Sequence, residues 1–169
     1  MGNHQLDYAT KHILVVDDKE FLRTVLSDIF RAVGFHVHNY SDVDAALTFL
    51  TSHNFNVDLM IIDHHVPFLP CSRIVEAVRK VKDKHELPIM VMTSTYKHRD
   101  EIFMYKKLKV NYFLYSCTPL EDIFYIAKHL VFSKEMQSAE HTKPIIGCPV
   151  DFKVNGNWKH AEAVNLTPQ

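Results

Sequence analysis

Two short apolar segments, each ending in aspartate, restrict the folds open to this chain. Residues 13–16 read ILVV and lead into Asp17 and Asp18, and residues 59–62 read LMII and lead into Asp63. Segments this short, rich in valine and isoleucine and free of glycine and proline, are typical of β-strands buried on both faces. Such strands occur in parallel sheets covered by helices on both sides. The two segments therefore favour an α/β fold.

Strand-like and helix-like segments alternate along the first 132 residues. Strands are expected at about residues 12–17, 35–39, 57–62, 88–92 and 112–115. Each is followed by apolar residues at three- and four-residue spacing, which predicts a helix. Gly34 is expected to end the first helix, and Ser41 can cap the second. Five strands alternating with five helices predict an α/β, doubly wound, five-stranded parallel sheet.

The pattern changes after about residue 132. Residues 133–146 are polar and are expected to form a helix end and a linker. Residues 147–169 alternate apolar and polar side chains around Asn155-Gly156, a strong signal for a β-hairpin. We expect a tail at residues 1–10, a main domain at 11–132 and a C-terminal hairpin. Because two strands are not stable alone, the hairpin must dock on the main domain, pair with another chain or begin a longer domain.

Composition excludes several classes of protein. The chain has 19 lysines and arginines against 20 aspartates and glutamates, which gives no general reason to expect binding to nucleic acid or to an anionic membrane. No apolar run approaches the roughly 18 residues of a membrane span, and the N-terminus lacks the apolar stretch of a secretory signal. The three cysteines are widely spaced, and we interpret them as reduced thiols of a cytoplasmic protein.

Asp17, Asp18 and Asp63 follow two of the expected strands at their carboxyl ends. In open parallel sheets these ends lie at one edge, where ligands bind. Three carboxylates gathered there would repel each other unless a cation lay among them, and ligands made only of oxygen suit Mg²⁺. A carboxylate can also accept a phosphoryl group. The alternative interpretation is that these aspartates cap helices or end solvated strands.

Taken in order, these residues resemble the receiver domain of two-component response regulators, over residues 11–132. By this resemblance Asp17, Asp18 and Asp63 hold Mg²⁺, and the backbone carbonyl of His65 completes the metal site. The resemblance makes Asp63 the phosphoryl acceptor. A transition-metal site at the neighbouring His64-His65 pair is a less favoured alternative, since loop histidines are common beside an acidic pocket.

The resemblance also implies a conformational switch. Thr93 would be the hydroxyl that contacts the phosphoryl group, and Phe113 the aromatic that then moves inward. The family's Lys-Pro pair after the fifth strand is replaced by Ser116-Cys117. A neutral hydroxyl brings no charge to a phosphoryl group. We therefore expect weaker coupling between phosphorylation and conformational change than the family pattern implies.

The function implied is that of a bacterial signalling domain and not of an enzyme, with at most phosphorylation and dephosphorylation of itself. The expected partner is a histidine kinase or a phosphotransfer protein. An output module, a partner or a second copy in a homodimer would bind the surface formed by the fourth helix, fifth strand and fifth helix. The main alternative is a degenerate receiver that acts as an interaction module without phosphorylation.

The C-terminal hairpin has a weaker resemblance to the start of a PilZ domain, a family that commonly binds cyclic di-GMP. Asn165 and Thr167 would begin the family's Asn/Asp-x-Ser-x-x-Gly motif. The arginines that bind the ligand's phosphates are missing, because no arginine follows Arg99. We do not expect this chain to bind cyclic di-GMP, and regulation of a cyclic di-GMP-sensing PilZ domain is kept only as a further alternative.

Overall fold

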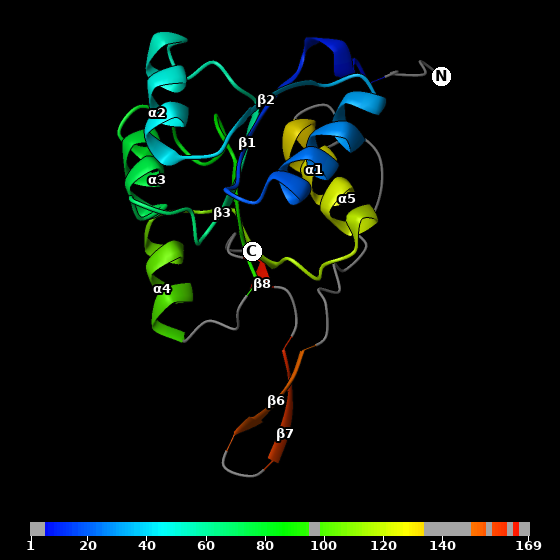
Figure 1. The fold of residues 1–169 in the computed structure, drawn as a ribbon, viewed down its shortest axis with the longest axis vertical. Helices are drawn as coiled ribbons and strands as arrows, with labels where there is room; N and C mark the ends of the chain where they lie inside the picture. The colour runs from blue at the N-terminus through cyan, green and yellow to red at the C-terminus, as the bar shows by residue number, and fades with distance from the viewer. Residues whose placement is uncertain (1–5, 95–98, 134–149, 155–156, 162–163, 166–169) are drawn as a thin grey trace.

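The computed structural model describes residues 6–94, 99–133, 150–154, 157–161 and 164–165 (Figure 1). Its strands are β1 (His12–Val16), β2 (His36–Tyr40), β3 (Leu59–Asp63), β4 (Ile89–Thr93), β5 (Tyr112–Tyr115), β6 (Val150–Val154), β7 (Asn157–Ala161) and β8 (Val164–Asn165). Its helices are η1 (Tyr8–Thr10, a 3₁₀ turn), α1 (Glu20–Ala32), α2 (Val43–Ser52), α3 (Ser72–Arg79), α4 (Arg99–Lys107) and α5 (Leu120–Val131). The predicted alternation from β1 to α5 is confirmed.

The main sheet has the strand order β2-β1-β3-β4-β5-β8. Its first five strands are parallel, as predicted. The chain runs outward from β1 to β2, then returns past β1 to β3, so the direction of winding reverses between β1 and β3. Ligand sites of open α/β sheets lie at the carboxyl ends of strands at such a reversal.

A sixth strand was not predicted. β8 pairs antiparallel with the outer edge of β5, with Tyr112 opposite Asn165 and Phe113 opposite Val164. A strand of two residues carries no usable sequence pattern, and its position depends on the unpaired edge that β5 offers. β6 and β7 form the predicted hairpin as a separate two-stranded sheet. Its expected turn at Asn155-Gly156 and the linker at 134–146 lie outside the described residues.

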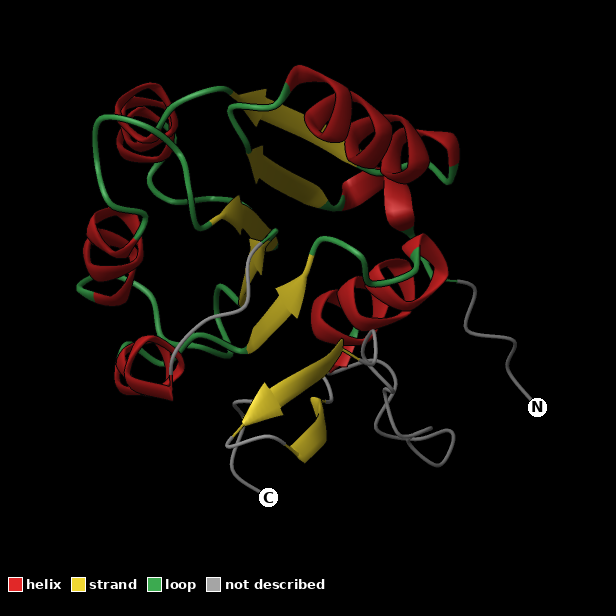
Figure 2. Ribbon diagram, turned by 60° about the horizontal axis from the view of Figure 1, so that its bottom comes forward, coloured by secondary structure: helices red, strands yellow, loops and turns green. Residues whose placement is uncertain are grey.

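Helices cover the main sheet in two layers (Figure 2): α1 and α5 lie on one face, and α2, α3 and α4 on the other. Because side chains alternate along a strand, Leu14 packs on the side of α2 and α3 while Ile13 packs on the side of α1 and α5. Both side chains are fully buried. None of the helices in the described part of the chain is both long and apolar enough to cross a bilayer.

The start of α2 differs by one residue from the prediction. Asp42, and not Ser41, caps this helix: its carboxylate accepts a hydrogen bond from the backbone N–H of Ala45 at 2.7 Å. The Ser41 hydroxyl instead donates to the Asp42 carboxylate at 3.4 Å. The helix begins at Val43, which places Asp42 in the capping position.

Candidate functional site

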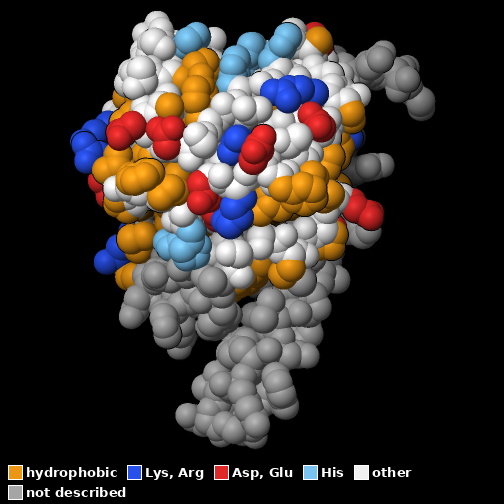
Figure 3. All heavy atoms as spheres, viewed as in Figure 1, with side chains coloured by type: hydrophobic (Ala, Val, Ile, Leu, Met, Phe, Trp, Pro, Cys, Tyr) orange, Lys and Arg blue, Asp and Glu red, His pale blue; other side chains and the backbone are white. Residues whose placement is uncertain are grey.

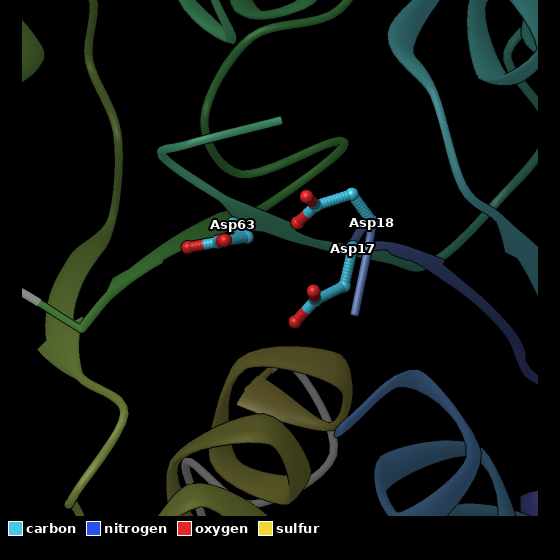
Figure 4. Close-up of side chains that lie close together, drawn as sticks. All are labelled: Asp17, Asp18 and Asp63. Atoms are coloured by element: carbon cyan, nitrogen blue, oxygen red, sulfur yellow. The ribbon is translucent and has the colours of Figure 1, made fainter. Parts of the chain in front are cut away.

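The three predicted carboxylates converge at the carboxyl ends of β1 and β3 (Figure 4). These strands are neighbours, and Val16 is paired with Ile62, so Asp17 and Asp63 are the next residues on adjacent strands. Ligating oxygens of Asp17, Asp18 and Asp63 all lie within 4.8 Å of one another. Asp17 and Asp63 are buried, and Asp18 is exposed to solvent. The fold thus brings the predicted residues into one cluster.

The donor set of this cluster fits a hard divalent cation. It consists only of carboxylate oxygens, and Mg²⁺ is typically bound by a few carboxylates while it keeps several waters. The exposed carboxylate of Asp18 leaves the cluster open on one side. Asp18 also lines a shallow pocket of about 330 Å³ beside the start of α2 and the β3–α3 loop, which includes Phe68. A small ligand can therefore reach the cluster from solvent.

Lys19 belongs to this site, and the sequence analysis missed it. Its Nζ lies 2.7 Å from Oδ2 of Asp63 and 3.6 Å from Oδ1 of Asp18. Its backbone N–H donates to Oδ1 of Asp17 at 2.8 Å. Figure 3 shows acidic and basic side chains side by side on one face of the molecule, near exposed hydrophobic groups. The signal available in the sequence was a lysine directly after the aspartate pair, at the end of a central strand.

Burial and the charges in the cluster together shift the pKa values of Asp17 and Lys19. Burial raises the pKa of Asp17, and the charges of Asp63 and Asp18 add to this effect, while the hydrogen bond from the Lys19 backbone and the Lys19 charge oppose it. Burial alone would lower the pKa of Lys19, but the hydrogen bond to Asp63 and the charges of the three aspartates outweigh it and raise the pKa. Lys19 is therefore a cation at neutral pH.

Thr93 and Ser116 lie at the carboxyl ends of β4 and β5, at the same edge of the sheet as the three carboxylates. Thr93 is the last residue of β4 and is fully buried, one position beyond Met92, the partner of Asp63. The backbone N–H of Ser116, just after β5, donates to the carbonyl of Thr93 at 2.7 Å. The structure therefore brings both predicted residues to the strand ends that carry the carboxylates. Their roles toward a phosphoryl group stay predictions.

Phe113 lies in the core between the sheet and α4. Only 1% of its surface is exposed, and its ring centroid lies 5.4 Å from that of Tyr105 and 6.3 Å from that of Tyr115. We expected Phe113 to move inward when the site is phosphorylated. In this structure the ring is already buried in the core on the side of α2, α3 and α4, where it packs against Tyr105.

The histidines after β3 differ in their surroundings. The ring of His64 is hydrogen-bonded to the hydroxyl of Tyr105, which also contacts Sγ of Cys71 at 2.6 Å. His65 is exposed, and the proposed use of its backbone carbonyl stays a prediction. Among the described residues, no cluster of three metal-ligating side chains includes a histidine. The geometry thus gives the less favoured transition-metal alternative no support.

Comparison with known proteins points to one family. The family model for the response regulator receiver domain matches residues 13–125. The chemotaxis protein CheY of Pseudomonas aeruginosa is 30% identical over 100 residues, which are 59% of this chain and 78% of that protein. The probable transcriptional regulator ycf27 of Cyanidium caldarium is 30% identical over 83 residues, 49% of this chain but only 31% of that longer protein. The chain thus spans less than a third of this relative's length.

Solved structures share the fold. A response regulator receiver domain protein from Clostridium thermocellum superimposes with a TM-score of 0.66 at 19% identity, over 75% of this chain and 98% of that one. The chemotaxis response regulator CheY4 of Vibrio cholerae gives a TM-score of 0.62 at 21% identity, over 71% and 98%. The family match ends at residue 125, so the division at residue 132 and the PilZ resemblance of residues 147–169 stay predictions.

Proposed function

The chain belongs to the response regulator receiver domain family, and from that premise we propose that it is a signalling receiver that accepts a phosphoryl group on Asp63. The observation that supports the proposal most is the convergence of Asp17, Asp18 and Asp63 from two adjacent strands. Receiver domains are generally non-enzymatic signalling modules. The chemistry proposed is accordingly limited to transfer onto the domain itself and hydrolysis of the product.

The transfer needs little from the protein beyond position and charge. An oxygen of Asp63 attacks the phosphorus of a phosphohistidine, and the new O–P bond forms as the N–P bond breaks. The leaving imidazole takes up a proton. When bound, Mg²⁺ would be held by Asp17, Asp18, Asp63 and the carbonyl of His65 and would neutralise negative charge on the phosphoryl oxygens. The donor is a histidine kinase or a phosphotransfer protein in the cytoplasm.

The signal would leave through the α4-β5-α5 surface. A phosphoryl group on Asp63 adds negative charge near the end of β4, where the hydroxyl of Thr93 can donate a hydrogen bond to it. Phe113 packs against Tyr105 of α4, so a movement of the Phe113 ring would be passed directly to this helix. β8 already pairs with the edge of β5. An output module, a partner or a second copy that binds this surface must therefore fit around β8 or displace it.

A second function is favoured by one specific observation: the ammonium of Lys19 already pairs with Asp63. The family resemblance adds that Ser116 takes the place of a lysine. A receiver with this charge arrangement can act as an interaction module that binds its partner without phosphorylation. In that case the α4-β5-α5 surface would be formed permanently.

Phosphorylation can be tested directly. The protein is incubated with Mg²⁺ and acetyl phosphate, and intact mass is measured for the wild type, for Asp63→Asn and for Asp58→Asn. Asp58 is a matched control, because it precedes β3 and pairs with Lys11 at 3.7 Å, away from the cluster. We expect one phosphoryl group on the wild type and on Asp58→Asn, and none on Asp63→Asn. An unmodified wild type would favour the interaction module.

A further inference from the structure

We propose that Lys19 is a built-in counter-ion of the acidic cluster and competes with Mg²⁺ for it. This inference rests on the proposed function, because it takes the three carboxylates to be the metal site. It goes further by assigning a role to a residue outside the expected ligand set. The role follows from where the ammonium lies: it contacts Asp63 and Asp18 at the opening of the cluster.

The backbone of Lys19 is fixed while its side chain can leave. The backbone N–H donates to Asp17 at 2.8 Å, which holds the residue at the start of α1. The side chain is 42% exposed and therefore has a path into solvent. A cation tethered in this way returns to the site at a high effective concentration and competes with an ion that must come from solution.

The ammonium and Mg²⁺ cannot occupy the cluster together at low cost. Mg²⁺ binds carboxylate oxygens at about 2.1 Å, and Nζ of Lys19 lies 2.7 Å from Oδ2 of Asp63. Two cations sharing that oxygen would lie less than about 5 Å apart, where like charges near a protein surface repel strongly. Binding of Mg²⁺ to that oxygen therefore favours departure of the Lys19 side chain from Asp63.

The same geometry gives Lys19 a second, opposite effect. Without the ammonium and without a divalent ion, three carboxylates within 4.8 Å of one another would carry uncompensated negative charge, two of them buried. Lys19 should therefore stabilise the protein when Mg²⁺ is absent and weaken the binding of Mg²⁺ when it is present. A residue with a purely structural role would show the first effect without the second.

Calorimetric titration with Mg²⁺ at fixed ionic strength tests the competition. We expect Lys19→Met to bind Mg²⁺ about three- to tenfold more tightly than the wild type, because an ion pair between the partly exposed Lys19 and the buried Asp63 no longer has to be broken. Lys19→Arg keeps the charge and should bind no more tightly than the wild type. Lys11→Met is the matched control: it removes a lysine paired with Asp58 at the other end of β1 and should leave Mg²⁺ affinity unchanged.

Thermal unfolding of the same variants supplies the second readout. In a chelator, Lys19→Met should melt below the wild type, and saturating Mg²⁺ should raise its midpoint more than it raises that of the wild type. Equal Mg²⁺ affinity in the wild type and Lys19→Met would overturn the inference and leave the proposed metal site standing. Absence of Mg²⁺ binding in every variant would overturn the metal site, and the inference with it.

Discussion

The ring of Tyr105 in α4 lies 5.4 Å from the ring of Phe113 in β5, with an angle of 32° between their planes. Only 1% of the surface of each side chain is exposed. The Tyr105 hydroxyl also contacts Cys71 and His64, the residue that follows Asp63. One buried side chain therefore touches the loop after Asp63, the start of α3 and the proposed switch aromatic.

Removal of the Tyr105 ring should be costly. We expect Tyr105→Ala to lower the free energy of unfolding by about 3–5 kcal/mol, the usual loss for a buried aromatic side chain. Phe103→Ala is the control in the same helix: Phe103 is 56% exposed, and its loss should change stability by no more than about 0.5 kcal/mol. Denaturant unfolding measures both. Similar losses for the two variants would contradict the packing described for α4.

Neutralising Asp17 should stabilise the protein in a chelator. Its raised pKa means that the folded state binds a proton more tightly than the unfolded state. The contribution of this group to stability is present at low pH and is lost as pH rises from 3.8 through the raised folded-state value. In Asp17→Asn the amide oxygen can still accept the hydrogen bond from Lys19. We expect a higher melting temperature than the wild type at neutral pH without divalent ions.

The metal dependence of that variant provides its control. Saturating Mg²⁺ should stabilise the wild type and should have little effect on Asp17→Asn, because one ligand has lost its charge. In the chelator, where Asp17→Asn should gain stability, Asp58→Asn should lose it. Its carboxylate accepts a hydrogen bond from the backbone of His12 at 2.8 Å and pairs with Lys11. A melting temperature of Asp17→Asn below the wild type would show that the interactions of the charged carboxylate with Lys19 outweigh the cost of its burial and the repulsion from Asp63 and Asp18.

Substitution of Asn111 should lower the stability of the protein without changing the binding of Mg²⁺ to the acidic cluster. This residue is 3% exposed and lies just before β5. Its side-chain oxygen accepts from the backbone N–H of Ile89 at 2.9 Å, and its side-chain nitrogen donates to the carbonyl of Lys84 at 3.0 Å. Asn111→Ala leaves both groups without these partners, and we expect a loss of about 3 kcal/mol.

Mg²⁺ titration of folded Asn111→Ala tests whether the two ends of the sheet are independent of each other. Asn111 lies at the amino ends of β4 and β5, opposite the edge that carries the carboxylates. The Mg²⁺ affinity of the Asn111→Ala variant should therefore equal that of the wild type. A weakened affinity would mean that the two edges are energetically coupled.

The histidines around β2 should make the protein less stable in mild acid. Nε2 of His38 lies 3.0 Å from Nδ1 of His12. Burial lowers the pKa of His38, and nearby positive charge lowers it further, from His12, His53, His36 and Arg31. Because the folded-state pKa is below 6.5, the unfolded chain binds more protons in this range. Stability from this group is present above about pH 6.5 and is lost as pH falls toward the folded-state value.

Unfolding experiments from pH 7 to pH 5 measure this loss. In His38→Gln the residue at this position cannot be protonated. The stability of this variant should therefore decline less between pH 7 and pH 5 than that of the wild type. His85→Gln is a suitable control, because it lies in the exposed turn before β4. A wild-type pH profile unchanged by His38→Gln would show that other groups cause the acid sensitivity.

The sequence by itself determined the five parallel strands of the main domain and the acidic cluster. Buried parallel strands such as residues 13–16 and 59–62 are visible locally as short apolar segments, and the sheet must bring their carboxyl ends together. Asp17, Asp18 and Asp63 could therefore be placed in one cluster before any coordinates. The predicted roles of Thr93, Phe113, Ser116 and His65 depend on the family resemblance and on the experiments above.

Only the tertiary structure decided which side chains meet across elements. The ion pair between Lys19 and Asp63, the contacts of Tyr105 and the pairing of β8 with β5 each join residues far apart in the chain. A lysine next to two aspartates could equally point into solvent. Neighbouring strands lie about 4.8 Å apart, a distance that a lysine side chain can span. Whether it does so depends on which carboxylate the adjacent strand places there, and local sequence patterns do not contain that information.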